Sequence, residues 1–314
     1  MDRASNVEVA NANAATNATA DLVAESPSAA FAQLPLLHAP VWKSSNRRAT
    51  LAVFATAVVA LIAVVVAGLM LEPVATQANF ASKNLAPCPA HPFGTDWMGR
   101  DMLARTLAGL STSVLLGLLA ATVSAVIALV LASVAALGGK RADAAVSWLI
   151  DLVMGIPHIV LLILISYALG KGFWGVAVGI ALTHWPSLTR VLRAEILQCR
   201  ESAYIGVARR LGQSSARIAV THMIPAVLPQ FVVGLVLLFP HAILHEAAVT
   251  FLGFGLSPDQ PAIGVILSES MGYLSAGMWW LAVFPGLALV ACVLLFDLAG
   301  SSLRTLVDPH TAQK

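Results

Sequence analysis

The sequence predicts an all-helical protein that crosses a membrane about six times, and three observations support this expectation. Of the 314 residues, 58% are hydrophobic and only 11% are charged, with a mean hydropathy of +0.83. Soluble domains carry about 25% charged residues, so one membrane domain with several spans is the simplest interpretation. The apolar residues are gathered into long runs, and the basic residues are divided unevenly among the segments that connect these runs.

The chain begins with a polar segment, residues 1–45, that we expect to be a disordered tail. This segment is rich in Ala, Asn, Thr and Ser and contains several prolines. Such a composition cannot bury enough apolar surface to fold. It also lacks the apolar stretch that a cleavable signal peptide requires.

Six apolar runs follow, and a membrane-spanning helix needs about 20 such residues. The runs cover about residues 49–71, 108–137, 144–169, 173–192, 226–245 and 279–300. The third run contains Pro157, and the fourth has His184 and Pro186 near its end. Gly175 and Gly179 in the fourth run predict a close helix contact, within the chain or with another subunit. We expect residues 46–107 to hold the first span and an outer loop, residues 108–303 a transmembrane domain, and residues 304–314 a C-terminal tail.

The lysine and arginine residues decide the expected orientation. If the N-terminus is cytoplasmic, four of the 18 lie in outer segments and the other fourteen lie in inner segments. The four outer residues are Lys83, Arg100, Arg105 and Lys171. Because segments rich in Lys and Arg stay on the cytoplasmic side, we expect both termini and the segment 200–229 to lie in the cytoplasm.

The segment 200–229, between the fourth and fifth runs, is too short and too charged to cross lipid. Its apolar residues recur at i, i+3, i+4 and i+7, which predicts one face of a short amphipathic helix. They are Tyr204, Val207, Ala208 and Leu211, and the other face carries Arg200, Glu201, Arg209 and Arg210. Gly212 is expected to end the helix. Such a helix fits either a groove on a soluble partner or a membrane surface with anionic headgroups.

The segment around Gly212 resembles a sequence motif of a known protein family. Gly212 occupies the glycine position of the pattern Glu-Ala-Ala-x-x-x-Gly in the cytoplasmic loop of binding-protein-dependent ABC importer permeases, and residues 224–229 resemble the proline-rich end of that loop. The triplet itself is degenerate, because it aligns with Gly206, Val207 and Ala208 and keeps only the last alanine.

Three further stretches resemble the dipeptide, oligopeptide and nickel branch of this family. Residues 91–105, HPFGTDWMGRDMLAR, resemble its GTD-x-x-GRD-x-x-x-R segment. The motif residues on the outer side are then Gly94, Asp96, Gly99, Arg100 and Asp101. Residues 243–256, ILHEAAVTFLGFGL, and residues 297–310, DLAGSSLRTLVDPH, resemble two more patterns of the branch. The chain is therefore identified as a member of this family, and as its second, C-type permease.

The resemblance implies a type I ABC importer permease fold in the inner membrane of a bacterium. Such a permease is expected to pair with a homologous sister permease, each forming half of the pore, and to receive solute from an extracytoplasmic binding protein. Two cytoplasmic ATP-binding subunits are expected to dock on the coupling loop, residues 193–225. The residues expected to carry this coupling are Tyr204, Val207, Ala208, Arg209, Leu211 and Gly212.

The chain itself is not expected to be an enzyme or to hold a cofactor. It lacks the phosphate-binding pattern GxxxxGK[ST], so ATP and Mg²⁺ are expected to act in the partner subunits. Lipid surrounds the spans in this interpretation, and no nucleic acid partner is expected. The alternative is a secondary transporter driven by an ion gradient, with Asp151 or Glu246 as its proton site.

Ionisable residues inside the runs indicate where solute passes, because charged groups are costly in lipid and usually face a pathway or a partner. His241 and His245 stand four residues apart, on one helix face and at a spacing that suits one metal ion, and Glu246 follows directly. These three are the pathway candidates, and the two histidines are also a candidate metal site. The alternative is that both histidines pack against neighbouring helices. The other ionisable residues are Asp151, His158, His184 and Asp297. Asp151 and Asp297 lie near the inner ends of their spans, where we expect a paired or solvated structural role rather than contact with the solute. His158 is expected only to satisfy a backbone carbonyl freed at the proline kink. The solutes expected for this permease are peptides and nickel or metal chelates.

Overall fold

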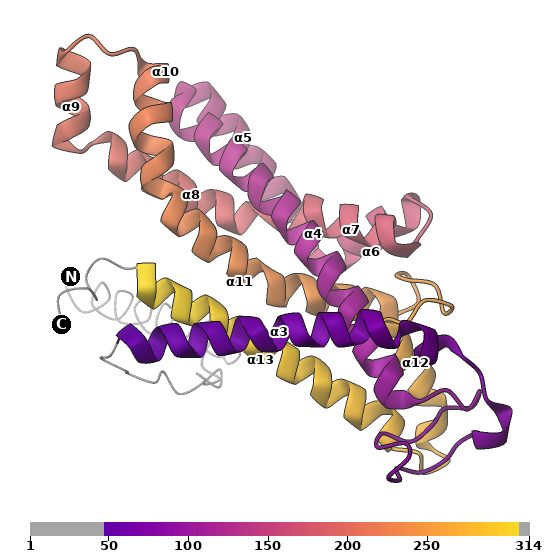
Figure 1. Ribbon diagram of the computed structural model, residues 1–314. Coiled ribbons are helices and arrows are strands. Elements are labelled where there is room, and N and C mark those ends of the chain that lie inside the picture. Colours follow the sequence, from indigo (N-terminus) through magenta and orange to yellow (C-terminus); the bar gives the residue numbers. More distant parts are fainter. Residues whose placement is uncertain (1–46, 308–314) are drawn as a thin grey trace, which may run out of the picture. The chain divides into compact units, whose positions relative to one another are not determined.

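The computed structural model describes residues 47–307, and every regular element in that range is a helix (Figure 1). The all-helical prediction is thereby confirmed. The predicted N-terminal tail, residues 1–45, and the last residues, 308–314, lie outside the described part of the chain. The last helix continues to Val307 and so includes the first residues of the segment 304–314 that was predicted as a C-terminal tail.

The helices follow one another with short connections, apart from one long segment between the first two long helices. They are α3 (Arg47–Thr76), the 3₁₀ turn η1 (Phe80–Ser82), α4 (Met102–Leu137), α5 (Gly139–Met154), α6 (His158–Ala168), α7 (Gly172–Thr183), α8 (Trp185–Arg200), α9 (Ala203–Arg210), α10 (Ser215–Ile218), the π-helical turn η2 (Ala219–Met223), α11 (Ile224–Phe251), α12 (Ile263–Leu274) and α13 (Trp280–Val307).

Within the described residues, four helical stretches are long and apolar enough to cross a membrane. They are α3, α4, α13 and the continuous stretch Ser215–Phe251, which joins α10, η2 and α11. These four coincide with the predicted first, second, sixth and fifth spans. The pair α5 and α6 satisfies the same criteria when its two helices are taken together, but it is bent by 90°.

The predicted third and fourth spans are each interrupted, and a proline accompanies each interruption. α5 ends at Met154, and α6 begins after Pro157. Proline has no N–H for the helical hydrogen bond and clashes with the preceding turn. α7 ends before His184, and α8 begins with Pro186 in its first turn, a position where proline is tolerated. The helices therefore do not confirm the count of six spans.

α4 is the central helix and contacts α3, α8 and α11. Its buried alanines recur at steps of four and three residues, at Ala121, Ala125, Ala128, Ala132 and Ala135. Small residues let helix backbones approach closely, which favours packing where lipid supplies no hydrophobic driving force between helices. The alanine stripe thus allows close packing of the helices that carry the candidate site.

α3 packs along α4 through a narrow buried side and presents its other side outward. The residues of the narrow side are Ala57, Leu61, Gly68 and Ala75. The outward side is apolar as well, with Val59, Ile62 and Met70 exposed. An apolar surface of this extent is rare in a soluble protein, and it suits a helix that contacts lipid.

The two glycines of the predicted GxxxG pair face α6 of the same chain. A Cβ atom added to Gly175 meets the Ser166 carbonyl oxygen at 2.9 Å, and one added to Gly179 meets the Leu162 carbonyl oxygen at 3.5 Å. The glycines therefore allow α7 to pack closely on α6. The sequence left open a contact within the chain or with another subunit, and the structure shows the contact within the chain.

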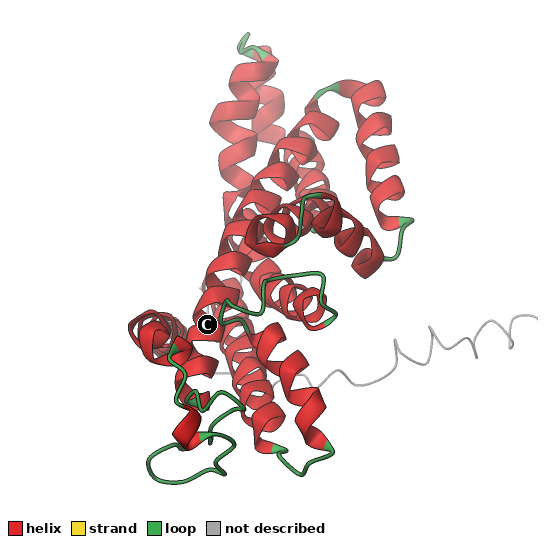
Figure 2. Ribbon diagram, turned by 90° about the vertical axis from the view of Figure 1, so that its right-hand side faces the viewer, coloured by secondary structure: helices red, strands yellow, loops and turns green. Residues whose placement is uncertain are grey.

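α9 and the segment 77–101 lie at opposite ends of the helices between residues 47 and 307. α9 lies at the top of Figure 1, whereas the segment 77–101 forms loops at the bottom right. Figure 2, turned by 90°, keeps the helical hairpins at the top and the long loops at the bottom. The candidate coupling segment and the candidate outer motif are thus separated by the full length of the helices.

Candidate functional site

A cavity of about 640 Å³ lies among α5, α6, α8 and α11. Both helix interruptions contribute to its wall, through Pro157 and His158 on one side and Thr183 and His184 on another. α11 supplies Gln230, His241 and His245, and α8 supplies Ser187. The proline-induced breaks that interrupt the third and fourth predicted spans therefore shape a largely apolar recess that carries a few polar groups.

Three histidines from separate segments meet at this cavity. His158 begins α6, His184 stands between α7 and α8, and His245 lies on α11. One ring nitrogen of each lies within 4.8 Å of those of the other two. The ring centroids are 4.5 to 4.9 Å apart, with the rings nearly perpendicular. We call these residues the histidine cluster.

Hydrogen bonds determine which ring nitrogens remain available in the cluster. His184 Nδ1 lies 3.1 Å from the Ile180 carbonyl oxygen, and His245 Nδ1 lies 2.7 Å from the His241 carbonyl oxygen. A carbonyl oxygen only accepts, so these Nδ1 atoms carry the proton and leave Nε2 with a free lone pair. The Nε2 atoms of His158 and His184 are buried without a hydrogen-bond partner.

The cluster contains only one residue of the predicted metal pair, His245, and not His241. His241 lines the same cavity, but it is exposed and its Nδ1 donates to the Leu237 carbonyl oxygen over 3.0 Å. The group close enough to share an ion contains His158 and His184 instead. His158 and His184 are 26 residues apart in the sequence, so residue spacing could not predict that they meet. The two helix breaks bring them together.

Glu246, the third predicted pathway residue, lies apart from His241 and His245. Its side chain is fully buried, Thr250 Oγ1 donates to its Oε1 over 2.9 Å, and it does not line the cavity. Consecutive helix residues point about 100° apart, so His245 faces the cavity while Glu246 turns into the packed helices. Glu246 is therefore not a residue of the cavity wall.

A second candidate site is the surface of α9. Tyr204, Val207 and Leu211 are 51%, 56% and 76% exposed, although all are large and apolar or aromatic. We call these three residues the α9 surface. Ala208, predicted to share this face, is buried together with Ile205, which the sequence argument missed. The apolar pattern located the helix, but it did not distinguish the side that packs on the protein from the side that faces out.

The ends of α9 are fixed by local hydrogen bonds. Before it, Ser202 Oγ donates to the Cys199 carbonyl oxygen over 2.6 Å, and the Tyr204 hydroxyl lies 2.9 Å from Cys199 Sγ. This hydrogen bond raises the pKa of the Tyr204 phenol above its ordinary value. After it, Gly212 has φ of +78°, the left-handed conformation that ends many helices and favours glycine.

Charged residues tie α8, which carries α9, to the neighbouring helices. The Arg193 guanidinium donates to both carboxylate oxygens of Asp143 on α5, over 2.5 and 2.6 Å. Arg200 Nη1 donates to the Ala136 carbonyl oxygen of α4 over 3.1 Å. A two-point arginine–carboxylate contact fixes orientation as well as distance, so α9 extends from a braced support.

Comparison with known proteins identifies the family. Residues 113–313 match the family described as binding-protein-dependent transport system inner membrane component. The chain belongs to this family. The prediction made from the sequence motifs is confirmed, and the protein is a multi-pass permease of the inner membrane.

Individual relatives cover most of the permease. A putative peptide permease protein of Brucella suis biovar 1 (strain 1330) is 34% identical over 88% of this chain and 93% of its own length. A putative peptide transport system permease protein of Brucella melitensis biotype 1 is 36% identical over 70% of this chain and 74% of its own length. A dipeptide transport system permease protein of Bacillus subtilis (strain 168) is 28% identical over 74% of this chain and 72% of its own length.

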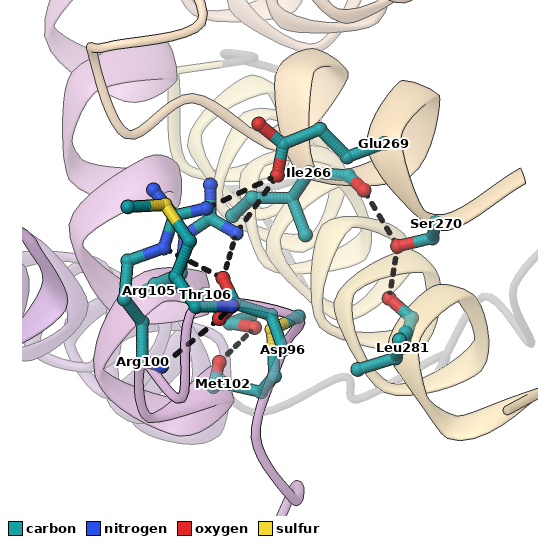
Figure 3. A network of polar contacts seen from close by, with 10 residues as sticks. Asp96, Arg100, Met102, Arg105, Thr106, Ile266, Glu269, Ser270 and Leu281 are labelled. Carbon is teal, nitrogen blue, oxygen red and sulfur yellow. Dashed lines mark hydrogen bonds and ion pairs between the residues drawn. The ribbon is translucent and has the colours of Figure 1, made fainter. Parts of the chain in front are cut away.

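The GTD–GRD motif of the permease forms an ionic network, drawn in Figure 3. Its loop, within the segment 77–101, lies at the end opposite α9 in Figure 1. Asp96 Oδ2 accepts from Arg100 Nε over 2.6 Å and from Arg105 Nη1 over 2.7 Å. Arg105 Nη1 also donates to Glu269 Oε2 of α12 over 2.9 Å. The backbone N–H groups of Met98 and Arg100 donate to Asp96 Oδ1, each over 2.9 Å.

The remaining motif residues of the permease shape the loop around this network. Asp101 caps α4 by accepting from the Ala104 N–H over 2.8 Å, and its other oxygen contacts His91 Nδ1 at 2.6 Å. Gly94 and Gly99 both have φ of +74°, which side chains other than glycine rarely adopt. The motif thus joins the loop 77–101 to α4 and α12, and the roles shown by its contacts are structural.

Proposed function

We propose that this permease forms half of a peptide translocation pore that is powered by two cytoplasmic ATP-binding subunits. A homologous sister permease supplies the other half, and an extracytoplasmic binding protein delivers the solute. ATP and Mg²⁺ act in the partner subunits, and the permease catalyses no covalent step. The observation that carries the proposal is the exposed α9 surface on a short helix in a chain of this family.

The α9 surface has the properties of a docking site for a soluble protein. Tyr204, Val207 and Leu211 lie on one side of the helix, and Arg209 and Arg210 beside them are exposed. Apolar residues with a charged rim are typical of a helix that enters a groove on a partner. A bilayer surface is the alternative occupant, but α9 offers only three large side chains to it, and stable membrane binding needs more apolar area.

The helical connection from α9 to the cavity supports transmission of movement. After the turn at Gly212, the continuous stretch Ser215–Phe251 runs from the α9 region to the cavity wall. It contains the π-helical turn η2 and the prolines Pro225 and Pro229. Such departures from regular α-helix create local bends. A displacement of α9 by a closing ATPase is thereby passed to His241 and His245.

We further propose six crossings with both termini and α9 in the cytoplasm. In this topology α5 with α6 forms the third crossing, and α7 with α8 forms the fourth, each broken at the cavity. The excess of basic residues in the inner segments supports this orientation. The placement of the segment 77–101 at the end opposite α9 is consistent with it. The interrupted helices agree with the rule that irregular backbone occurs at membrane depth only where it lines a cavity or is buried in protein.

The names of the relatives and the size of the cavity both support peptides as the solute. Two Brucella relatives are named as peptide permeases, and the Bacillus relative as a dipeptide permease. Sites for small organic ligands have volumes of about 300–1,000 Å³, and the cavity has about 640 Å³. Nickel or a metal chelate is the second candidate solute, and the histidine cluster is the observation that favours it.

The deciding experiment measures ATP hydrolysis and dipeptide uptake by the full complex in liposomes. We expect Leu211→Asp and Tyr204→Asp to lower uptake at least tenfold and to weaken retention of the ATP-binding subunits. Ala144→Asp introduces the same charge at an exposed residue of α5 and serves as the control that retains uptake. Uptake that persists in both α9 variants, or that needs no ATP-binding subunit, would overturn the proposal in favour of a carrier driven by an ion gradient.

A further inference from the structure

We propose that His158, His184 and His245 bind one divalent transition-metal ion in the wall of the cavity, with coordination positions left open to the solute. Within residues 47–307, this is the only group of three histidine, cysteine or acidic side chains that is close enough to share an ion. That the ion lies on the translocation path depends on the proposed function. The metal site itself depends only on the geometry of the three rings.

The hydrogen bonds prepare the histidines to act as ligands. Metal-binding histidines usually donate their second ring N–H to a carbonyl or carboxylate, which fixes the tautomer and the ring orientation. His184 and His245 do so with the carbonyl oxygens of Ile180 and His241, at 3.1 and 2.7 Å. Their Nε2 atoms are thereby left as the electron-pair donors.

The unpartnered nitrogen atoms are the second, independent indication of a ligand. The Nε2 atoms of His158 and His184 are buried and have no hydrogen-bond partner. A buried polar atom without a partner costs about 1–3 kcal/mol, so native structures seldom retain one without a reason. Two such atoms, on neighbouring rings packed edge to face, are both satisfied by one shared metal ion.

The distances require only a small closure of the cluster. Ligand nitrogens in tetrahedral coordination at about 2.0–2.1 Å from the metal lie about 3.4 Å apart, compared with the limit of 4.8 Å observed here. The ligand nitrogens therefore need to approach one another by up to about 1.4 Å. Each ring stands on a different helical segment, and His158 and His184 stand at the helix interruptions, where side chains and backbone can adjust.

The chemistry of the site indicates which ions it prefers. Three neutral imidazoles suit Zn²⁺, Ni²⁺, Cu²⁺ and Co²⁺, whereas Mg²⁺ and Ca²⁺ prefer oxygen ligands. The described residues that line the cavity include no aspartate or glutamate. The charge of the ion is therefore left for a bound solute to neutralise, and the carboxylate and amine of a short peptide are suitable groups for the open positions.

The test titrates Co²⁺ into the full complex, purified through an affinity tag without histidine. Co²⁺ held by three imidazoles in tetrahedral geometry absorbs visible light much more strongly than hydrated Co²⁺, so the spectrum reports the site directly. We expect one strongly absorbing Co²⁺ per permease chain. Adding diglycine to the loaded complex is expected to change the spectrum as the solute enters the open positions.

Substitutions in the cluster distinguish it from other histidines of the cavity. We expect His158→Gln, His184→Gln and His245→Gln each to lower the affinity for Co²⁺ at least tenfold. His241→Gln is the matched control, because His241 lines the same cavity outside the cluster, and its affinity should stay within threefold of the unaltered protein. Retention of the partner subunits and the thermal unfolding midpoint confirm that each variant is folded.

Two results would contradict the site. If the unaltered complex shows only the spectrum of hydrated Co²⁺, the three rings merely pack edge to face. If His241→Gln weakens binding as much as the cluster variants, the ion lies elsewhere in the cavity. Neither result bears on ATP-driven dipeptide uptake. The metal site can therefore be disproved without disproving the proposed function.

Discussion

Arg105 Nη1 lies 2.7 Å from Asp96 Oδ2, and the two side chains are only 3% and 4% exposed. The pair joins the start of α4 to the loop before it, and Glu269 extends the contact to α12. Burying two charges is costly, and only close contact with further hydrogen bonds offsets the lost hydration. Asp96 has such bonds from two backbone N–H groups.

The first prediction concerns this buried pair. Arg105→Met leaves Asp96 without one of its two arginine partners, so we expect a loss of about 3–5 kcal/mol of stability. Asp151→Asn is the control, because its pair with Arg190 is 70% and 53% exposed, and exposed pairs contribute about 0–1 kcal/mol. Thermal unfolding of the detergent-solubilised complex measures both. Equal losses in the two variants would show that the network does not support the fold.

The second prediction concerns two glycines of the coupling segment. A Cβ atom added to Gly206 or to Gly212 meets no atom within 4 Å, and only Gly212 has a positive φ, of +78°. Gly206→Ala should therefore stabilise α9 by roughly 0.5–1 kcal/mol, whereas Gly212→Ala should destabilise it by about 1–2 kcal/mol. Hydrogen exchange of the α9 amides measures the change. Slower exchange in both variants would mean that the turn after α9 does not need its left-handed conformation.

These glycines also show how far a sequence argument reaches in this chain. The apolar period and Gly212 were enough to predict a short helix and its end, because both depend on local geometry. The period could not say that Ala208 faces inward, since Ile205 packs on the core and so fixes the rotation of the helix. That rotation depends on tertiary contacts, which no residue within α9 reveals.

The cavity illustrates the same limit at longer range. Pro157 and Pro186 were visible as irregularities in two apolar runs, but the bend of 90° between α5 and α6 depends on how the helices pack. Only after this bend does His158 meet His184 and His245. His245 lines the cavity and Glu246 does not, because adjacent helix residues point to different sides. The positions of proline and histidine in the sequence thus indicated where the helices are irregular. They did not indicate which of these irregular segments meet in space.

The third prediction tests whether Glu246 takes part in transport. Its Oε1 accepts from Thr250, its side chain is fully buried, and it does not contact the cavity. Glutamine keeps the size and the accepting oxygen, so Glu246→Gln should retain ATP-driven dipeptide uptake within about threefold. Uptake should also remain unaffected by a proton ionophore. Loss of uptake by a folded Glu246→Gln complex, with ionophore sensitivity in the unaltered one, would support proton-driven transport instead.

The fourth prediction concerns the attachment of α3, which precedes the matched residues 113–313. A Cβ atom added to Gly68 comes within 2.3 Å of the Leu107 carbonyl oxygen and 2.5 Å of Ser111 Cβ. These neighbours are backbone of α4 and the first side-chain carbon, so they cannot turn aside. Gly68→Ala should therefore separate α3 from α4 and lower the unfolding midpoint of the complex, because helix contacts in lipid depend on close packing.

Gly272 provides the matched control for this substitution. It lies within α12, and a Cβ atom added there meets nothing within 4 Å. Gly272→Ala should be neutral or slightly stabilising, since alanine favours helix by about 1 kcal/mol over glycine. Limited proteolysis then locates the damage. Early cleavage in the segment 77–101 of Gly68→Ala, with α4 to α13 still protected, is the expected pattern; equal protection in both variants would show that α3 does not need this close contact.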